Sequence, residues 1–357
     1  MKIVFIISSL QAGGAERVIS NIANNFDNIG HNITILVLSK ETPFYSINSS
    51  IELIQLGVDK PKGRDFISRA KHIPNIIFTL KSNILDLNPD IVISFLTKVN
   101  IISTIVSKLT KTPIIVSERT NFNALNKKMW RFFRRVIYPY SDALVVQSKF
   151  DKEKYYFHKN CQIIHNPIYK FNRYKNIKRE KIVLAVGRLV ELKGFDMLIE
   201  AFSSLKNRDW RLIIAGEGKI RDKLQKQIID NKMEKSISLI GRVSDIERYY
   251  KKASIFVLSS RIEGFPNVLI EAISYGCPSI AFNCLTGPSD IIKDGENGLL
   301  VEANNVKGLS KNIELLQNNK ELRDKFSKSG VEISKELSID KISNRWLEVI
   351  NSVLEKR

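Results

Sequence analysis

Cysteine and histidine are scarce in this chain. Its 357 residues include three cysteines, at positions 161, 277 and 284, and four histidines. No two cysteines form a Cys-x-x-Cys pair, and the histidines show no ligand spacing, which argues against a disulfide scaffold, a structural zinc or a catalytic metal site. We therefore expect a protein of the reducing cytoplasm that holds no metal and no cofactor.

Long apolar runs are also absent. No run approaches the roughly 18 apolar residues that a membrane-spanning helix requires. The opening segment MKIVFIISSL has a short apolar part and leads into GGAER without a small-residue cleavage site. It predicts a buried first strand rather than a signal peptide. We expect a cytoplasmic protein that is soluble or peripheral to a membrane.

Acidic residues are fewer than basic ones. The chain has 56 Lys and Arg against 37 Asp and Glu, a formal net charge of +19. A balance this basic predicts polyanionic partners: nucleic acid, an anionic membrane surface or phosphorylated substrates. Hydrophobic residues make up 43 % and charged residues 26 % of the chain, which is typical of a globular protein and excludes a disordered or fibrous one.

Two similar series of apolar runs predict an α/β protein with two doubly wound, Rossmann-like domains. The runs begin at positions 3, 33, 51, 90, 113 and 143 in the first half, and at 181, 210, 237, 254, 278 and 298 in the second. Continuous Val- and Ile-rich runs separated by helical stretches are typical of parallel sheets covered on both faces. Ligands of such folds bind beyond the carboxyl ends of the strands, so two facing domains would place an active site in the cleft between them.

Composition suggests where the domains meet. The stretch NPIYKFNRYKNIKRE is polar, basic and aperiodic, as expected of a linker. We predict an N-terminal domain over residues 1–168, a linker over 169–180 and a C-terminal domain over 181–338. Residues 339–357 contain an amphipathic helix that we expect to pack across both domains.

The segment EGFPNVLIE carries two glutamates, Glu263 and Glu271, with seven residues between them. Pro266 blocks an earlier start of the helix and Asn267 is a good cap, so Glu263 is predicted in a loop and Glu271 about one turn into a helix. The first amides of that helix would bind an anion, and the carboxylates would hold sugar hydroxyls and a ribose. Spacing alone equally fits two solvated carboxylates around a turn.

The segment VGRLVELKGF places two cations, Arg188 and Lys193, after a predicted strand. Cations at the carboxyl end of a parallel strand suit a diphosphate, because arginine grips phosphate oxygens bidentately and lysine acts as a point charge. Two solvated cations are the alternative. In the first half, SSLQAGGAERV predicts a strand, a tight Gly13-Gly14 turn and a helix, where a phosphate could approach the backbone, although an ordinary turn fits as well.

The stretch from Arg119 to Ser141 contains no acidic residue. On a helix its apolar residues Met129, Phe133 and Val136 share one face, with Trp130 and Ile137 beside them, and its cations Lys127, Arg131, Arg134 and Arg135 fall on the other. A basic amphipathic helix with Trp and Phe is typical of a membrane-surface helix. The predicted membrane-binding residues are Lys127, Lys128, Trp130, Arg131, Phe133, Arg134 and Arg135. A solvated basic face over an ordinary core and a nucleic-acid patch are the alternatives.

Taken together, EGFPNVLIE, GRLVELKGFDMLIEAF, GEGKIRDKL, the GRV at residues 241–243 and GPSDIIKDGENGLLV resemble the donor-binding half of the retaining glycosyltransferases of family 4, which have the GT-B fold. The GGAER segment is similar to that family's first loop. The pattern of ISFL, SER and MWRFFRRVIYPYSDAL further resembles the subgroup that extends lipid-linked glycans for bacterial surface polysaccharide or protein glycosylation.

The resemblance implies roles for the matching residues. Glu271 would hold the ribose of a nucleotide sugar and Glu263 the transferred sugar, while Arg188 and Lys193 would bind the diphosphate and stabilise the leaving nucleotide. Further donor contacts are implied at Gly14, Gly241, Arg242, Val243, Asn267, Val268 and Leu269. No protein nucleophile and no metal would be needed.

One position departs from the family pattern. Many relatives have a histidine where this chain has Arg119, after Ser117 and Glu118. The role of that histidine cannot be transferred, and we hypothesise that Arg119, with Glu118 beside it, binds the acceptor and its phosphate.

The resemblance implies a retaining glycosyltransferase that moves a hexose or N-acetylhexosamine from a UDP-sugar to a polyprenyl-diphosphate-linked oligosaccharide at the cytoplasmic face of an anionic inner membrane, without nucleic acid. The alternatives are a UDP-sugar epimerase of the same fold and a non-catalytic protein that binds membranes or nucleic acid. Sequence leaves the sugar, the linkage and the choice of UDP over GDP open.

Overall fold

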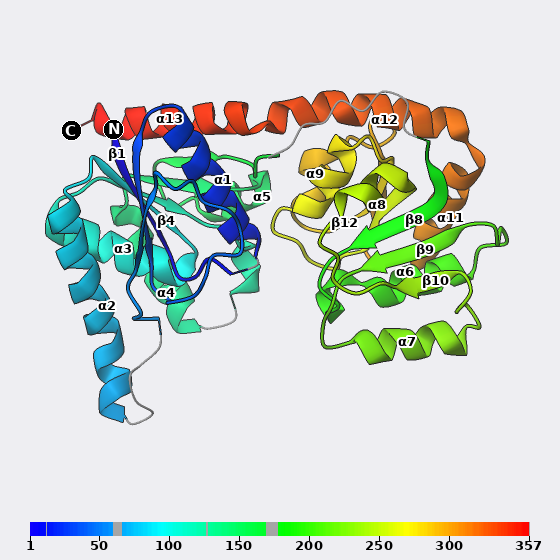
Figure 1. The fold of residues 1–357 in the computed structure, drawn as a ribbon, viewed down its shortest axis with the longest axis horizontal. Coiled ribbons are helices and arrows are strands. Elements are labelled where there is room, and N and C mark those ends of the chain that lie inside the picture. The colour runs from blue at the N-terminus through cyan, green and yellow to red at the C-terminus, as the bar shows by residue number, and fades with distance from the viewer. Residues whose placement is uncertain (12, 60–65, 126–127, 169–177, 357) are drawn as a thin grey trace. The chain divides into compact units, whose positions relative to one another are not determined.

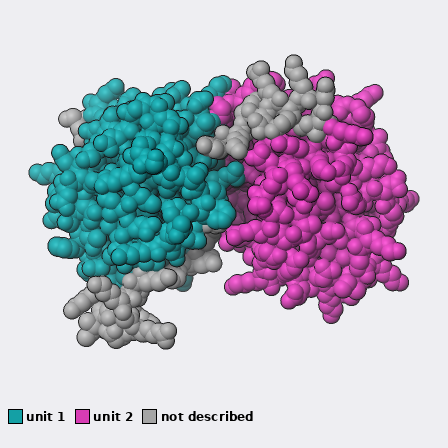
Figure 2. Space-filling view, viewed as in Figure 1, with its two compact units in different colours: residues 1–169, 339–357 teal, residues 170–338 magenta. Residues whose placement is uncertain are grey.

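The computed structural model describes residues 1–11, 13–59, 66–125, 128–168 and 178–356. The chain forms two compact units (Figure 1, Figure 2). Unit 1 comprises residues 1–169 and 339–357, and unit 2 comprises residues 170–338. Most of the predicted linker, residues 169–177, lies outside the described residues, and Glu180 already begins the first strand of unit 2.

Unit 1 is built on a parallel sheet. Among its described residues the strand order is β3-β2-β1-β4-β5-β6-β7, and each neighbouring pair is parallel. The strands are β1 (Lys2–Ile7), β2 (Asn32–Val37), β3 (Glu52–Gln55), β4 (Ile91–Phe95), β5 (Ile114–Ser117), β6 (Ala143–Val146) and β7 (Cys161–Ile163). The six strands predicted for this half are confirmed. The seventh, β7, has three residues, too few to produce a recognisable apolar run.

Helices cover the sheet of unit 1 and close its core. They are α1 (Gly14–Asn28), α2 (Phe66–Leu87), α3 (Thr97–Thr110), α4 (Lys128–Ile137), α5 (Lys149–Lys154) and α13 (Ile339–Leu354), with short 3₁₀ turns η1 (Phe122–Ala124) and η2 (Tyr138–Tyr140). From α13, Trp346 is fully buried and its ring stacks on Phe95 at the end of β4, with 6.1 Å between ring centroids. The C-terminal helix is therefore part of the core of unit 1. Its expected contact with the second domain stays a prediction.

Unit 2 repeats the same architecture. Its described strands are parallel and lie in the order β10-β9-β8-β11-β12-β13. They are β8 (Glu180–Val186), β9 (Arg211–Ala215), β10 (Ile237–Leu239), β11 (Ala253–Leu258), β12 (Ser279–Asn283) and β13 (Leu299–Glu302). Every residue of β11 is buried, as expected of a central strand covered on both faces.

The helices of unit 2 are η3 (Glu191–Lys193), α6 (Phe195–Ser203), α7 (Arg221–Asp230), α8 (Glu247–Lys252), α9 (Asn267–Ser274), α10 (Pro288–Ile291), α11 (Val306–Asn318), α12 (Lys320–Ser334) and η4 (Lys335–Leu337). One apolar cluster joins α6, α7, α11 and α12 to the sheet, with Phe202 of α6, Ile228 of α7 and Phe326 of α12 among its members.

The strand order of each unit contains one switch point, where the connections turn to opposite sides. It lies between β1 and β4 in unit 1 and between β8 and β11 in unit 2. The predicted fold class, two Rossmann-like parallel sheets, is confirmed. Doubly wound sheets bind ligands at the carboxyl ends of the strands beside this point, so the loops after β8 and β11 are where a ligand is expected in unit 2.

No helix of the described residues is long and apolar enough to cross a bilayer.

Arg179 fastens three segments of unit 2 at the start of β8. Its guanidinium donates hydrogen bonds to the carbonyl oxygens of Tyr250 (3.1 Å), Ala253 (2.5 Å) and Tyr275 (2.7 Å), and a longer one to Lys251. These carbonyls belong to the end of α8, the start of β11 and the end of α9. The side chain of Arg179 thus connects α8, β11 and α9 to the start of β8.

Arg179→Ala should lower the melting temperature of the protein by several degrees. Each hydrogen bond from a charged donor contributes about 1.5–3 kcal/mol, and about 1 kcal/mol corresponds to about 2–4 °C for a domain of this size. Differential scanning calorimetry measures the change. Lys181→Ala is the control, because Lys181 forms an exposed ion pair with Asp209 and its loss should barely change the melting temperature. Equal melting temperatures for wild type and Arg179→Ala would contradict this role.

Candidate active site

The loops at the switch point of unit 2 bring Lys193 and Glu263 together. We name them the β8 loop, residues 187–194, and the β11 loop, residues 259–266. The β8 loop carries Arg188 and Lys193, and the β11 loop carries Glu263. Because both loops leave the carboxyl ends of neighbouring parallel strands, the side chains of Lys193 and Glu263 meet although 70 residues separate them in sequence.

The Nζ atom of Lys193 lies 2.5 Å from Oε1 of Glu263. The side chain of Glu263 is only 8 % exposed, and the hydroxyl of buried Ser260 donates a second hydrogen bond of 2.6 Å to the same oxygen. Burying a carboxylate is costly unless a cation and hydrogen bonds compensate it. An anionic ligand that binds Lys193 breaks its ion pair with Glu263. Such a ligand must therefore also donate a hydrogen bond to Glu263, and a sugar hydroxyl is such a donor.

Arg188 is exposed at the carboxyl end of β8. Within the described residues its guanidinium forms no ion pair or side-chain hydrogen bond. It differs in this from Lys193, which is already paired. An exposed guanidinium beside the switch point is free to bind phosphate oxygens bidentately.

Helix α9 begins at Asn267, as the sequence predicts, but Asn267 does not cap it. The residue at the cap is Pro266, and no side chain caps the helix. The amide of Leu269 donates to the carbonyl of Pro266 at 3.0 Å. The Leu269 amide thus already has a partner in this conformation, and its binding of phosphate or sugar stays a prediction. Asn267 and Val268 lie at the helix start, half-buried.

Glu271 lies on the second turn of α9, as predicted, and has a partner that the sequence does not reveal. The buried Tyr250 of α8 donates a hydrogen bond of 3.0 Å to Oε2 of Glu271. Tyr250 in turn stacks on Tyr275. No local motif links a tyrosine to a glutamate 21 residues later. Ser260, by contrast, follows β11 within two residues, and its position among polar loop residues was a usable signal.

Glycines line the carboxyl ends of β8, β9 and β10. Gly216 has a φ of +152°, and a Cβ atom there would lie 1.8 Å from the carbonyl oxygen of Gly187. The amide of Gly216 donates to the carbonyl of Gly241 at 2.8 Å. Only glycine allows this close approach of backbones. This contact fixes the backbone at Gly241, which begins the segment of residues 241–243 where further donor contacts are implied.

In unit 1, helix α1 starts at Gly14, after Gly13 at the cap. A Cβ atom on Gly13 would lie 2.1 Å from Oε2 of Glu16, so the carboxylate of Glu16 covers the start of the helix. Carboxylates are favoured at helix N-termini for the same reason as phosphates. An anion that approaches Gly14 must therefore displace Glu16.

The predicted acceptor residue Glu118 is buried in unit 1. Its carboxylate accepts hydrogen bonds from the hydroxyls of Thr97 (2.7 Å), Thr120 (2.7 Å) and Tyr138 (2.8 Å). Burial, followed by the charge of Glu118, raises the pKa of Tyr138 well above its ordinary value, so this hydroxyl stays a donor. Three hydroxyls already occupy the carboxylate in this conformation, and the contact of Glu118 with an acceptor stays a prediction.

Arg119 is also buried, with 8 % of its surface exposed. Its Nε donates to Ser117 (2.7 Å) and its Nη1 to Asn166 (2.8 Å), and its guanidinium lies near the rings of Phe95 and Trp346. Burial lowers the pKa of Arg119 to about 9, against the opposing effect of Glu118. Aromatic rings and two polar partners surround the cation, but Nη2 has no hydrogen-bond partner among the described residues, and the binding of an acceptor phosphate by Arg119 stays a hypothesis.

Helix α4 exposes a different set of residues from the predicted one. Arg134, expected on the solvent face, is 2 % exposed, and its guanidinium lies 4.0 Å from the centroid of Phe122. Trp130 packs against the core of unit 1. Arg134 is thus buried and Trp130 half-buried, and the predicted role of both in membrane binding stays untested. Lys128, Arg131, Phe133 and Arg135 are exposed, and Lys127 lies outside the described residues.

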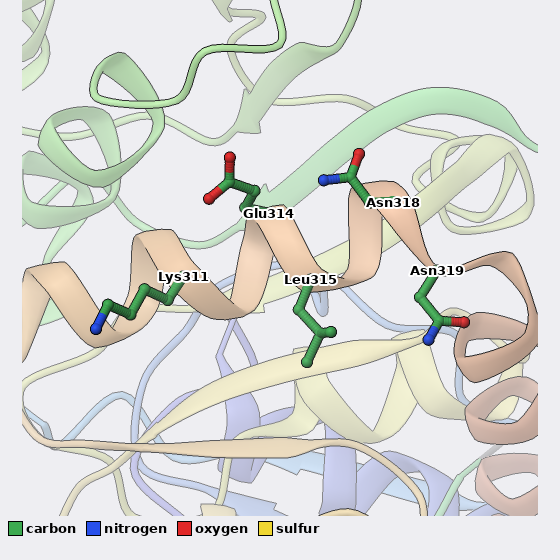
Figure 3. Close-up of a pocket in the computed structure, with 5 residues that line it drawn as sticks. All are labelled: Lys311, Glu314, Leu315, Asn318 and Asn319. Carbon is green, nitrogen blue, oxygen red and sulfur yellow. The ribbon is translucent and has the colours of Figure 1, made fainter.

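A hollow of about 420 Å³ lies at the end of α11, and no residue of the β8 or β11 loop lines it (Figure 3). Lys311, Glu314, Leu315, Asn318 and Asn319 line it. All five belong to one helix and its end, and their polar groups point in different directions rather than toward one another (Figure 3). No predicted site residue lines this hollow, and we assign it no function.

Within the described residues, no group of three or more His, Cys, Asp or Glu side chains is placed to hold a metal ion. The cysteines are buried and free. Burial raises the pKa of Cys161 to about 12 and those of Cys277 and Cys284 to about 11. Their thiols are therefore protonated and unreactive at neutral pH.

Comparisons with known proteins agree with this architecture. The family model described as "Glycosyltransferase Family 4" matches residues 12–169, and that described as "Glycosyl transferases group 1" matches residues 169–332. A Campylobacter jejuni protein named "GalNAc-alpha-(1->4)-GalNAc-alpha-(1->3)-diNAcBac-PP-undecaprenol alpha-1,4-N-acetyl-D-galactosaminyltransferase" is 32 % identical, over 99 % of both chains. The amylovoran biosynthesis glycosyltransferase AmsD of Erwinia amylovora is 26 % identical over 98 % of this chain and 99 % of its own.

Among solved structures, Anabaena HepE in complex with UDP matches with a TM-score of 0.80 and 16 % identity over 99 % of this chain and 100 % of that one. At this identity the likeness concerns the fold alone. The fold, the family models and the full-length relatives all agree. The chain therefore belongs to glycosyltransferase family 4 and is a glycosyltransferase with the GT-B fold.

Proposed function

We propose that this enzyme transfers a hexose or N-acetylhexosamine from a UDP-sugar to a polyprenyl-diphosphate-linked oligosaccharide, with retention of configuration. The observation that carries the proposal is the meeting of Lys193 and Glu263 at the switch point of unit 2, with Arg188 exposed beside them. The names of relatives support the substrates: the Campylobacter jejuni enzyme is named for a PP-undecaprenol glycan, and the Anabaena structure contains UDP.

The proposed roles follow from the charges of the site. Arg188 and Lys193 bind the diphosphate and stabilise the negative charge that grows on it as its bond to the sugar breaks. Glu263, released from Lys193, accepts hydrogen bonds from the hydroxyls of the transferred sugar. Glu271, oriented by Tyr250, holds the ribose. The acceptor hydroxyl attacks on the face that the nucleotide leaves, which requires no protein nucleophile.

The second part of the proposal is attachment to an anionic membrane through unit 1. Four large apolar side chains of α4 are exposed, Phe132 and Met129 most of all, at 64 % and 55 %, then Val136 and Phe133. We call these four residues the α4 patch. Lys128, Arg131 and Arg135 surround them on the same helix, and all three are exposed. Apolar side chains ringed by cations suit a bilayer with anionic headgroups.

An apolar hollow next to α4 adds to this surface. It has a volume of about 270 Å³, and its lining consists of Thr104, Ile105, Lys108, Leu109, Ile137 and Tyr140. Leu109 and Tyr140 are more than half exposed. We infer that the enzyme works at the cytoplasmic face of the inner membrane, where a lipid-linked acceptor would be presented.

Isothermal titration calorimetry tests the donor site. UDP should bind, and Arg188→Ala should weaken its binding roughly tenfold or more, because one charge-assisted interaction contributes about 1.5–3 kcal/mol. Glu271→Gln should weaken UDP binding less, since one side-chain oxygen remains. Arg211→Ala, at the opposite end of the sheet, should bind UDP like wild type.

Preferred binding of GDP or ADP would contradict the choice of UDP. Sugar transfer is then measured with and without a polyprenyl-diphosphate-linked acceptor. Conversion of the UDP-sugar to an isomer without any acceptor would identify an epimerase instead.

Transfer should not require a metal ion, because Arg188 and Lys193 supply the positive charge that a divalent cation would otherwise provide. The measurement is the initial rate of sugar transfer after treatment with EDTA and gel filtration, with and without added Mg²⁺ or Mn²⁺. Rates within about twofold of each other are expected. A rate that disappears with EDTA and returns with one of these ions would overturn metal independence.

Vesicle sedimentation tests the α4 patch. The protein should bind vesicles of anionic phospholipid and not vesicles of phosphatidylcholine, and salt should weaken the binding. The double variant Phe132→Ser/Val136→Ser should bind roughly tenfold or more weakly, because each buried apolar side chain contributes about 1.5–3 kcal/mol.

Phe78→Ser is the control, since Phe78 of α2 is an aromatic residue outside the patch that is even more exposed than Phe132, at 75 %. A loss of binding in both variants would show that the α4 patch has no special role. Tight binding to DNA at physiological salt would favour the nucleic-acid alternative.

A further inference from the structure

The two loops that carry Lys193 and Glu263 are held to each other by their backbones. The amide of Arg261 donates to the carbonyl of Leu192 at 2.8 Å, and the hydroxyl of Ser259 donates to the carbonyl of Lys193 at 3.0 Å. Gly194 has a φ of +62°, and a Cβ atom there would lie 2.0 Å from the carbonyl oxygen of Ser259. The β8 and β11 loops thus touch through main-chain atoms directly beside Lys193.

A side-chain pair connects the β11 loop to the start of α6, directly after the β8 loop. Arg261 and Asp196 form a bidentate ion pair, with Nη1–Oδ1 at 2.8 Å and Nη2–Oδ2 at 2.6 Å. Nη1 of Arg261 also donates to the carbonyl of Glu191, within the β8 loop, at 2.7 Å. Both side chains are partly buried. Such a fork of parallel hydrogen bonds fixes orientation as well as distance.

The charges of this pair stabilise each other. Burial raises the pKa of Asp196, but the hydrogen bonds and charge of Arg261 outweigh it, and the pKa lies below its ordinary value. The hydrogen bond with Asp196 raises the pKa of Arg261. Both groups therefore stay ionised through the neutral range, and the bridge between the loops persists there.

The ion pair of Arg261 and Asp196 lies close in sequence to both residues of the site. Arg261 is two residues before Glu263, and Asp196 is three residues after Lys193. On the basis of the proposed function, we propose that Arg261 and Asp196 are positioning residues that hold Lys193 and Glu263 at the separation required for sugar transfer. They touch neither the diphosphate nor the sugar in this scheme. They act through the two loops.

A positioning role differs from simple stabilisation in what it changes. Misplacement of catalytic groups by about 1 Å can reduce a rate by up to about 100-fold while the fold survives. Loss of an exposed ion pair elsewhere in unit 2, such as Lys181 with Asp209, should change neither the rate nor the loops. This second pair is therefore a matched control in the same unit.

The first measurement uses the free protein and needs no substrate. Hydrogen–deuterium exchange is compared for wild type, Arg261→Gln, Asp196→Asn and Lys181→Ala. Exchange should become faster over residues 187–194 and 259–266 in the first two variants and stay unchanged in Lys181→Ala. Unchanged exchange over both loops in Arg261→Gln would overturn the proposal, whatever the reaction proves to be.

The second measurement is steady-state sugar transfer. Arg261→Gln should reduce kcat by roughly 10- to 100-fold with KM for the donor within about threefold of wild type. Arg261→Lys keeps the charge but not the fork, and should recover part of kcat. The double variant Arg261→Gln/Asp196→Asn should be no slower than the slower single variant, because each single substitution already removes the Arg261–Asp196 ion pair.

A kcat of Arg261→Gln within twofold of wild type would overturn the positioning role, and so would a fall in kcat that Arg261→Lys does not relieve at all. Absence of transfer by the wild-type enzyme with every donor and acceptor would count against the proposed function. The exchange measurement would still decide whether Arg261 and Asp196 hold the two loops.

Discussion

The ion pair between Lys193 and Glu263 requires strands β8 and β11 to be neighbours in a parallel sheet, since only then do the loops that follow them share one edge. Two neighbouring residues stabilise this pair. Ser260 donates a second hydrogen bond to the buried carboxylate, and Gly194 lets the two backbones approach. The pair also limits which ligands fit. A ligand must offer negative charge to the lysine and donors to the glutamate at once, a combination that a sugar phosphate possesses.

Unit 1 uses its charges differently. Glu118 is enclosed by three hydroxyls, Arg119 by two polar partners and aromatic rings, and Arg134 by Phe122. Each charge is removed from water, and neighbouring groups compensate the two cations only in part, because Nη2 of Arg119 and Nη1 of Arg134 have no hydrogen-bond partner among the described residues. The net charge of the chain therefore overstates the positive charge available at the surface near α4. Among the described residues of α4, the exposed cations are Lys128, Arg131 and Arg135.

The sequence predicted the parts of the fold that depend on local pattern. The Val- and Ile-rich strands and the start of α9 at Asn267 all follow from periodicity and from Pro266. It was less able to predict which polar groups are buried. The helical periodicity of residues 128–137 places Arg134 with the other cations. In the structure the guanidinium of Arg134 instead packs on Phe122, which belongs to the separate turn η1. The Tyr250–Glu271 and Arg261–Asp196 contacts join residues that are 21 and 65 positions apart, so no local motif reveals them.

The place of α13 in unit 1 has a consequence for how the chain acquires its structure. Unit 2 is one continuous stretch of sequence, whereas unit 1 needs both ends of the chain. Trp346 covers Phe95 and lies near Arg119, so the core of unit 1 is incomplete until α13 has left the ribosome. Domains usually fold in the order in which they are synthesised. Here the unit that begins first is completed only after unit 2 has been synthesised, and a nascent chain exposes the apolar surface of unit 1 around Phe95 until α13 is available to cover it.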